Sequence, residues 1–170
     1  MEFPLTTSRL LIRPFDDDDL NAMHEIYADP EVMQFIPSGT SRDLAHSRQR
    51  LEKIKEHQDK NGFSQWAVVE QATGNLVGIC GLILVESKGP EVEVAYEFAR
   101  AVWNRGYATE AIGACLRAGF EQFGMTRIVG MTFPDNVPSQ RVLEKNGMRR
   151  LGIRQYYNKD LVLYELTVVE

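Results

Sequence analysis

The hydrophobic period of the chain changes at Asn61-Gly62, and this change constrains the fold more than any other feature of the sequence. Before this point the apolar residues recur at helical spacing. After it, apolar and polar residues alternate through residues 63–70, 76–85 and 91–98, which predicts three consecutive antiparallel strands. A sheet built around such a meander buries apolar side chains on both faces, so helices must pack against it from both sides.

The other elements follow from the same reading of periodicity and turn residues. We expect strands at residues 9–13, 127–133, 148–157 and 161–169, and helices at 16–27, 41–60 (capped by Ser41), 108–123 and 136–146. This order predicts an α/β fold with a mixed, mostly antiparallel sheet of seven strands flanked by about four helices. The 170 residues fit one domain spanning 1–170.

Charge and cysteine usage narrow the class of protein. The net charge of −5 argues against a nucleic-acid-binding protein with a uniformly basic surface, although a local basic patch stays open. Cys80 and Cys115 lie in apolar stretches without C-x-x-C spacing and are expected to be reduced core residues. His24, His46 and His57 share no ligand spacing, so we expect no metal site. Without a leader or an apolar run of about 20 residues, we expect a cytoplasmic protein with no membrane partner.

Residues 102–111 join the third strand of the meander to a strongly amphipathic helix, with Gly106 in the turn that opens the helix. Backbone N–H groups at a helix start point outward at the positive end of the helix dipole, and glycine lets a ligand approach them closely. Such a turn suits phosphate oxygens, although an ordinary strand-to-helix turn would also contain this glycine. Neither G-x-x-x-x-G-K-[ST] nor G-x-G-x-x-G is present, which excludes the two common nucleotide-binding templates.

The turn sequence Trp103-Asn-Arg-Gly-Tyr-Ala108 resembles the pyrophosphate-binding signature of the GNAT acyl-coenzyme A N-acyltransferases. Its continuation through Thr-Glu-Ala111 is similar to the RimJ/RimL-like branch, which contains the ribosomal-protein N-terminal acetyltransferases. Further similarity to this family lies at residues 7–15, 29–33, 93–96 and 136–147. The resemblance implies a single GNAT domain whose fourth and fifth strands, at 91–98 and 127–133, splay apart.

The resemblance also implies that acetyl-CoA is the co-substrate, with its pantetheine arm in the gap between the splayed strands. The implied cofactor-binding residues are Tyr96, Glu97 and Phe98 on the strand, Asn104, Arg105, Gly106, Tyr107, Ala108 and Thr109 in the turn, and Asn136 on the next helix. The side chain of Arg105 is either a charge-assisted phosphate contact or a solvated cation. Arg141, Lys145, Arg149 and Arg150 either meet the 3′-phosphate or form a solvated face.

A general base is needed because amines are mostly protonated at pH 7 and only the neutral amine attacks. Glu91, Glu93 and Glu97 share one nominal strand face. Glu93 matches the acid that the family has in this strand, so the resemblance implies Glu93 as the base. The bland alternative is a salt-bridged or solvated glutamate.

The leaving thiol needs a hydrogen-bond partner, and the resemblance implies Ser139 for this role. Many relatives use a tyrosine further along the same helix, but residues 141–146 contain none. Asn136 and Ser139 lie one turn apart, so they share a helix face; both also occur simply as helix caps. The backbone N–H of Tyr96 or Glu97 is the expected donor to the thioester carbonyl.

The acceptor pocket of this fold lies between the first helices and the closing hairpin, which implies Tyr27, Phe35, Trp66, Tyr156 and Tyr157 as substrate-binding residues. Aromatic side chains suit a protein N-terminus, a polyamine or another small-molecule amine equally well. The resemblance therefore implies an acetyl-CoA-dependent N-acetyltransferase acting on a primary amine, and GNAT proteins often form homodimers. The alternative is a non-catalytic coenzyme A-binding sensor or structural module, which would be expected to lose Glu93 or Ser139.

Overall fold

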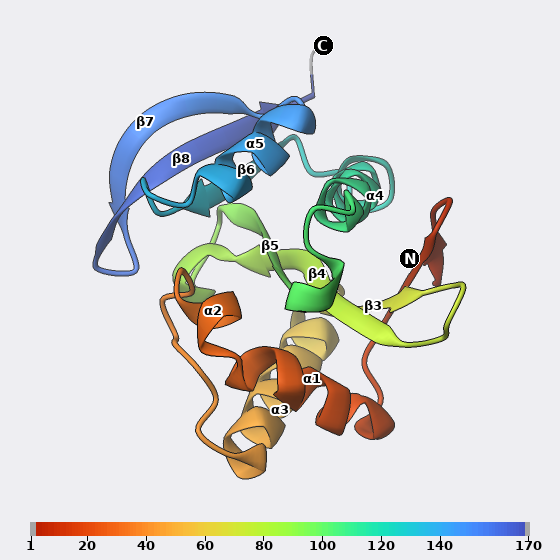
Figure 1. Ribbon diagram of the computed structural model, residues 1–170. Helices are drawn as coiled ribbons and strands as arrows, with labels where there is room; N and C mark the ends of the chain where they lie inside the picture. Colours follow the sequence, from red (N-terminus) through yellow and green to blue (C-terminus); the bar gives the residue numbers. More distant parts are fainter. Residues whose placement is uncertain (1–2, 169–170) are drawn as a thin grey trace.

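A sheet of eight strands runs through the middle of the molecule (Figure 1). The computed structural model describes residues 3–168. The strands are ordered β1-β2-β3-β4-β5-β6-β8-β7, with bounds β1 (Leu5–Thr6), β2 (Leu10–Arg13), β3 (Gln65–Glu70), β4 (Leu76–Leu84), β5 (Val92–Phe98), β6 (Arg127–Thr132), β7 (Arg149–Tyr156) and β8 (Lys159–Thr167). Within this sheet only β5 and β6 pair in parallel. The predicted mixed, mostly antiparallel α/β fold is confirmed.

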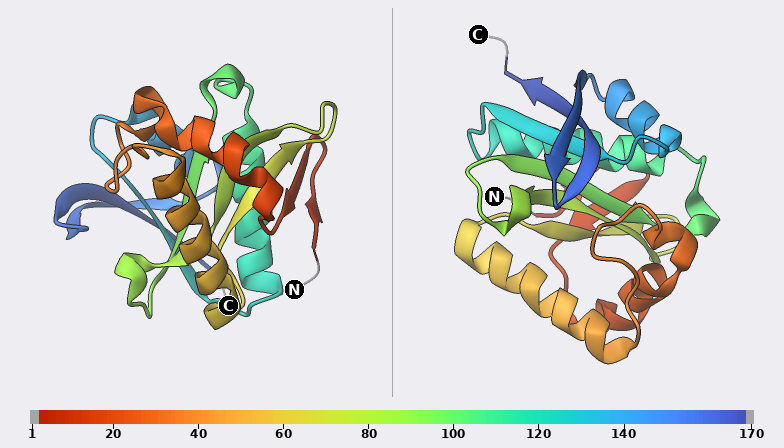
Figure 2. Two further views of the ribbon diagram at one scale, coloured as in Figure 1. Left: turned by 90° about the horizontal axis from the view of Figure 1, so that it is seen from below. Right: turned by 90° about the vertical axis from the view of Figure 1, so that its left-hand side faces the viewer.

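Helices cover both faces of the sheet (Figure 2). On one side lie α1 (Leu20–Ala28), α2 (Pro30–Met33) and α3 (Leu44–Asn61), and on the other α4 (Tyr107–Glu121) and α5 (Val137–Lys145). The first layer packs through Met23, Ile26 and Leu51, and the second through Ile112 and Cys115, all of them buried. Each long helix thus presents one apolar stripe to the sheet.

The sheet opens at its centre. Strands β4 and β5 pair continuously from Gly78↔Phe98 to Leu84↔Val92, whereas β5 and β6 meet only at Glu93↔Val129. The crossover from β5 to β6 runs through α4, as a parallel pair requires. The expected splay between these two strands is therefore present.

The differences from the sequence-based expectation are local. The eighth strand is β1, which pairs with β2 through Leu5 and Thr6, and α2 adds one helical turn after Asp29. Ser41 does not cap α3. Asp43 caps it, accepting the N–H of His46 (2.8 Å), and aspartate is as good an N-cap as serine. The predicted end of the last strand at residue 169 lies outside the described residues.

Cys80 on β4 and Cys115 on α4 are buried free thiols whose sulfur atoms lie 3.5 Å apart. Their predicted place as reduced core residues is confirmed. Across residues 3–168, none of the helices has the length and apolar character needed to span a membrane.

Candidate active site

A cavity of about 960 Å³ opens along β5 where β6 leaves it. Its walls come from β5, the turn before α4, the start of α5, and the segment from α1 to α3. The sequence-predicted site residues that line it are Tyr27, Phe35, Glu93, Tyr96, Glu97, Phe98, Asn104, Gly106, Tyr107, Ala108, Thr109, Asn136, Ser139 and Tyr157. Trp66, Arg105 and Tyr156 do not line it.

The turn before α4 presents unpaired backbone N–H groups. Gly106 has φ of +80°, and a Cβ built there would meet a single atom, at 3.4 Å, so a ligand can approach the backbone. Glu110 donates its N–H to Gly106 O (3.1 Å), but the N–H groups of Tyr107, Ala108 and Thr109 have no helical acceptor. They lie at the positive end of a 15-residue helix. This arrangement fits a phosphate-bearing ligand such as coenzyme A.

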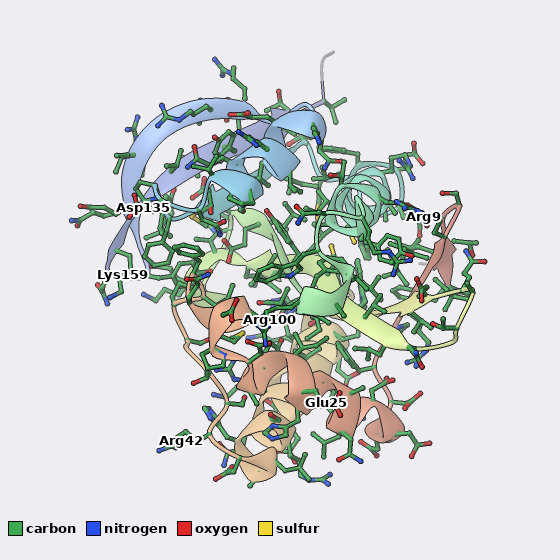
Figure 3. The ribbon with its side chains drawn as sticks, in the orientation of Figure 1. Arg9, Glu25, Arg42, Arg100, Asp135 and Lys159 are labelled. Carbon is green, nitrogen blue, oxygen red and sulfur yellow. The ribbon has the colours of Figure 1, made fainter. Side chains whose placement is uncertain are left out.

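A network of five side chains, which we call the turn network, holds this turn from outside the cavity; it consists of Arg9, Glu70, Arg105, Tyr107 and Glu110. Arg9, labelled in Figure 3, donates from Nη1 to Arg105 O (2.8 Å) and from Nε to Glu110 (2.7 Å). The guanidinium groups of Arg9 and Arg105 lie 4.5 and 4.8 Å from the Tyr107 ring centroid.

Glu70 decides the direction of Arg105 in this network. Its carboxylate accepts a hydrogen bond from the Tyr107 hydroxyl and pairs with Arg105 (3.0 Å). The guanidinium is therefore held at β3, and Arg105 does not line the cavity; a phosphate contact, one of the two alternatives for this side chain, stays a prediction. The backbone of Arg105 still forms part of the turn.

Glu93 lies on β5 at the single β5–β6 register pair and is 7% exposed. Burial raises the pKa of Glu93 to about 7, the hydrogen bond from the Tyr157 hydroxyl lowers it, and the charge of Glu86 raises it. Burial also raises the pKa of Tyr157, so its hydroxyl stays a donor. A carboxyl group with a pKa near neutrality can accept and release a proton at physiological pH.

Glu91 and Glu97, the other two glutamates along β5 and its start, differ in their partners and in the direction of their pKa shifts. Glu97 is buried, accepts a hydrogen bond from Gln65 (3.1 Å), and has its pKa raised by burial to about 7. Glu91 bonds to Arg127, which lowers its pKa, and accepts a hydrogen bond from the Tyr156 hydroxyl (3.0 Å). Glu91 thus holds the Tyr156 hydroxyl, and Tyr156 does not line the cavity, so its place in an acceptor pocket stays a prediction.

Ser139 on α5 contacts Tyr96 on β5 across the gap, with 2.5 Å between the two hydroxyl oxygens. Asn136 is the N-cap of α5, accepting the N–H of Ser139 (3.3 Å), so the Ser139 hydroxyl itself is not a cap. Burial raises the pKa of Tyr96 and keeps its hydroxyl protonated. Sequence reasoning assigns Tyr96 a backbone role only and misses this contact. The available signal is the lack of a tyrosine on α5.

The acceptor side of the cavity is aromatic. Tyr27 and Phe35 line it, and the Phe35 ring lies 6.0 Å from that of Phe133, which follows β6. Trp66 is fully buried, with its indole N–H donated to a glutamine of α3 (2.9 Å), so its predicted place in this pocket is wrong. Its neighbour Gln65 lines the cavity instead.

An ion-pair cluster connects α2, next to the aromatic side of the cavity, to the end of β5. Arg100, labelled in Figure 3, follows β5 and contacts Asp29 and Glu31 at the start of α2, both at 2.6 Å. The α2 segment is thereby held beside the end of the strand that carries Glu93. Among the described residues, His, Cys, Asp and Glu form no group of three or more that could hold a metal ion.

Comparisons with known proteins identify the class. Residues 9–149 match the acetyltransferase (GNAT) domain family. The chain is 34% identical over 152 residues to the Bacillus subtilis protein named uncharacterized N-acetyltransferase YnaD, covering 87% of this chain and 84% of that protein. A GNAT-family acetyltransferase from Bacillus anthracis has a crystal structure that matches with a TM-score of 0.84 at 30% identity, over 97% of this chain and 98% of that one.

A more distant relative shares the fold alone. RimL, a ribosomal-protein alpha-N-acetyltransferase solved with coenzyme A, matches with a TM-score of 0.80 at 14% identity, over 98% of both chains. The chain belongs to the GNAT acetyltransferase family and is an N-acetyltransferase.

Proposed function

We propose that this protein transfers the acetyl group of acetyl-CoA to a primary amine by direct attack of the amine on the thioester. The observation that carries the proposal is Glu93, a buried carboxyl group whose pKa is raised to about 7 where β5 and β6 separate. It shares its cavity with the free N–H groups that open α4. Acetyl-CoA supplies the acetyl group in activated form, and membership of the GNAT family supports acetyl transfer as the reaction.

The turn at Gly106 holds the pyrophosphate through the first N–H groups of α4, where charge and backbone donors favour an anion. The β5 edge at Tyr96, Glu97 and Phe98 borders the gap that receives the pantetheine arm, and Asn136 lies on the α5 side of the same cavity. The turn network keeps the turn in shape from outside, so little reorganisation is needed when the cofactor binds.

Glu93 takes a proton from the attacking amine. The N–C bond forms and the C–S bond breaks, while the proton passes to a carboxylate oxygen of Glu93. An α-amino group has a pKa of about 8, close to the value of about 7 for Glu93, and such matching favours proton transfer. The Tyr157 hydroxyl orients Oε1, and among the described residues none donates to Oε2.

Ser139 assists the leaving sulfur. A thiolate with a pKa of about 8.5 leaves readily, so one hydrogen bond is enough help. The Tyr96 hydroxyl lies 2.5 Å from Ser139 Oγ; when the tyrosine donates in this contact, the serine hydroxyl hydrogen stays free for the sulfur. Tyr96 is thus a positioning residue on this side of the reaction.

Release of coenzyme A from acetyl-CoA in the presence of amines tests the proposal. The panel contains free amino acids, spermidine, an aminoglycoside and short peptides with an N-terminal alanine or serine. We expect thiol release above the hydrolysis rate for at least one class, with the acetylated product identified by mass spectrometry. Tight coenzyme A binding by calorimetry without turnover of any amine would favour the non-catalytic module instead.

A further inference from the structure

One face of α3 brings basic side chains to the cavity. His46, Arg50 and Lys53 are spaced i, i+4 and i+7, so they share one side of the helix. All three line the cavity, and Glu93 and Glu97 line it from β5. We call the first set the basic wall and the second the acidic wall. A single cavity thus carries opposite charges on two elements.

Arg50 is held rigidly in the basic wall. Its guanidinium lies 4.7 Å from the ring centroid of Tyr27. Its Nη2 donates to the carbonyl oxygens of Ser38 (3.2 Å) and Gly39. Among the described residues, none accepts a hydrogen bond from Nε or Nη1. A fixed guanidinium with unused donors is suited to bind a carboxylate, because little side-chain entropy is lost on binding.

Arg50 and Lys53 form no ion pair within the described residues, and the same holds for Arg141 and Lys145, which line the cavity from α5. Burial raises the pKa of Glu97, and the charge of Arg50 lowers it. Carboxylates form ion pairs with Arg9, Arg13, Arg100, Arg105, Arg127 and Arg149. In the described part of the chain, no carboxylate lies within ion-pair distance of Arg50 or Lys53. Arg50 also stabilises the segment at residues 38–39 through Nη2. This structural role does not explain why Nε and Nη1 are free of partners within residues 3–168, nor why Lys53 faces the cavity from the same side of the helix.

From this arrangement we propose that the acceptor is a small amine that carries a carboxylate, an amino-acid-like zwitterion. Its amino group lies at the acidic wall, and its carboxylate is bound by Arg50 and Lys53. This inference rests on the proposed function and names its substrate class. A polycation such as spermidine would meet like charge at the basic wall, which disfavours it.

Matched pairs of amines test the inference on the unmodified enzyme. The pairs differ by one carboxylate: phenylalanine and 2-phenylethylamine, methionine and 3-(methylthio)propylamine, and 4-aminobutyrate and propylamine. The rates are expressed per concentration of neutral amine. We expect kcat/KM to favour the carboxylate in at least one pair by about 10- to 100-fold, the range for a hydrogen bond to a charged group. Turnover of amines or peptides with no such preference would overturn the inference but leave the proposed function intact.

Variants assign the preference to Arg50. In Arg50→Gln the carboxylate preference should fall at least about tenfold, whereas Arg50→Lys should keep part of it. Arg48→Gln is the matched control, since Arg48 is exposed on the same helix and does not line the cavity. The selectivity ratio separates binding from bracing, because a purely structural role would lower both rates of a pair alike. An unchanged ratio in Arg50→Gln would overturn the assignment, and no turnover of any amine would overturn both proposals.

Discussion

Glu70 on β3 and Glu93 on β5 are buried to nearly the same degree, 8% and 7% exposed, yet their pKa values move in opposite directions. Glu70 accepts hydrogen bonds from Tyr107 and Thr73 and pairs with Arg105, and these partners lower its pKa. Glu93 accepts one hydrogen bond, from a tyrosine, and burial raises its pKa to about 7. Desolvation outweighs the single hydrogen bond at Glu93, whereas the hydrogen bonds and the ion pair outweigh desolvation at Glu70, and this balance decides the direction of each pKa shift.

This difference separates two regions of the molecule. In the turn network, Glu70 and Glu110 are each bound by an arginine and by hydroxyl groups. In the cavity, a single hydrogen bond offsets the desolvation of the Glu93 carboxyl group. A permanently ionised carboxylate in a network orders its neighbours. A carboxyl group near its titration point can exchange protons with a substrate. Under the proposed function, the first region positions the turn that binds the cofactor, and the second carries the proton transfer.

The largest expected effect lies at the turn that the Glu70 region holds. Gly106→Val should abolish coenzyme A binding, because φ of +80° is strained for valine and the added side chain, directed toward Arg9, would shift the turn that carries the N–H groups. Gly74→Val is the matched control, with φ of +73° in the open turn after β3. Both should lose about 1–3 kcal/mol of stability from backbone strain. Unchanged coenzyme A affinity of folded Gly106→Val by calorimetry would contradict the site.

The next effect concerns proton transfer in the Glu93 region. Glu93→Gln should lower kcat/KM by about 10²–10⁴-fold while the affinity for acetyl-CoA holds. The deficit should shrink as pH rises, because more of the amine is then already neutral. Glu97→Gln is the control, since Glu97 has a similar raised pKa but bonds to Gln65. A deficit that is equal at every pH, or larger in Glu97→Gln, would remove Glu93 as the base.

Replacing Glu70 or Glu93 by glutamine should shift the melting temperature in opposite directions at pH 8. The pKa of folded Glu93 lies above the unfolded value of about 4.3, so ionisation destabilises the fold as pH rises through about 7. Glu93→Gln should therefore raise the melting temperature at pH 8. The pKa of folded Glu70 is lowered, so its stabilisation is present at pH 8 and is lost as pH falls through the folded pKa. Glu70→Gln should lower the melting temperature by a few degrees at pH 8; shifts of the same sign would break the comparison.

The smallest effect is expected on the leaving side. Ser139→Ala should slow turnover about 10-fold, the scale of one hydrogen bond. Its melting temperature should fall modestly, because the Tyr96 hydroxyl loses its contact with Ser139 while Asn136 still caps α5. Tyr96→Phe should act through the same contact, so the double variant should be no slower than the slower single one. Turnover at the unmodified rate in Ser139→Ala would leave a water molecule as the proton donor.

Much of the site is predictable because its parts are local in sequence. Gly106 predicts the turn before α4, because a glycine between a strand and an amphipathic helix indicates a tight connection between the two. Alternation puts Glu91, Glu93 and Glu97 on one nominal face of the strand, and the family resemblance selects Glu93 among them. The splay of β5 from β6 came from the family resemblance, and the register confirms it.

The sequence does not predict contacts between residues that lie far apart along the chain. Both faces of β3 are buried, so alternation does not tell which of Gln65 and Trp66 faces the cavity. The Arg105 side chain pairs with Glu70, and Tyr96 contacts Ser139, which lies 43 positions further along the chain. No pattern within a window of ten residues contains these contacts. Spatial proximity has to be known first.

The single β5–β6 register pair also bears on how the amides of this protein exchange hydrogen with water. In most sheets the central strands are protected and the edges exchange first, because their backbone groups lack ladder partners. Here the side of β5 that faces β6 lacks a ladder beyond Glu93, although β5 lies in the middle of the sheet. Slow and fast amides should therefore alternate along one central strand. Rapidly exchanging amides are therefore expected at the centre of the sheet as well as at its edges.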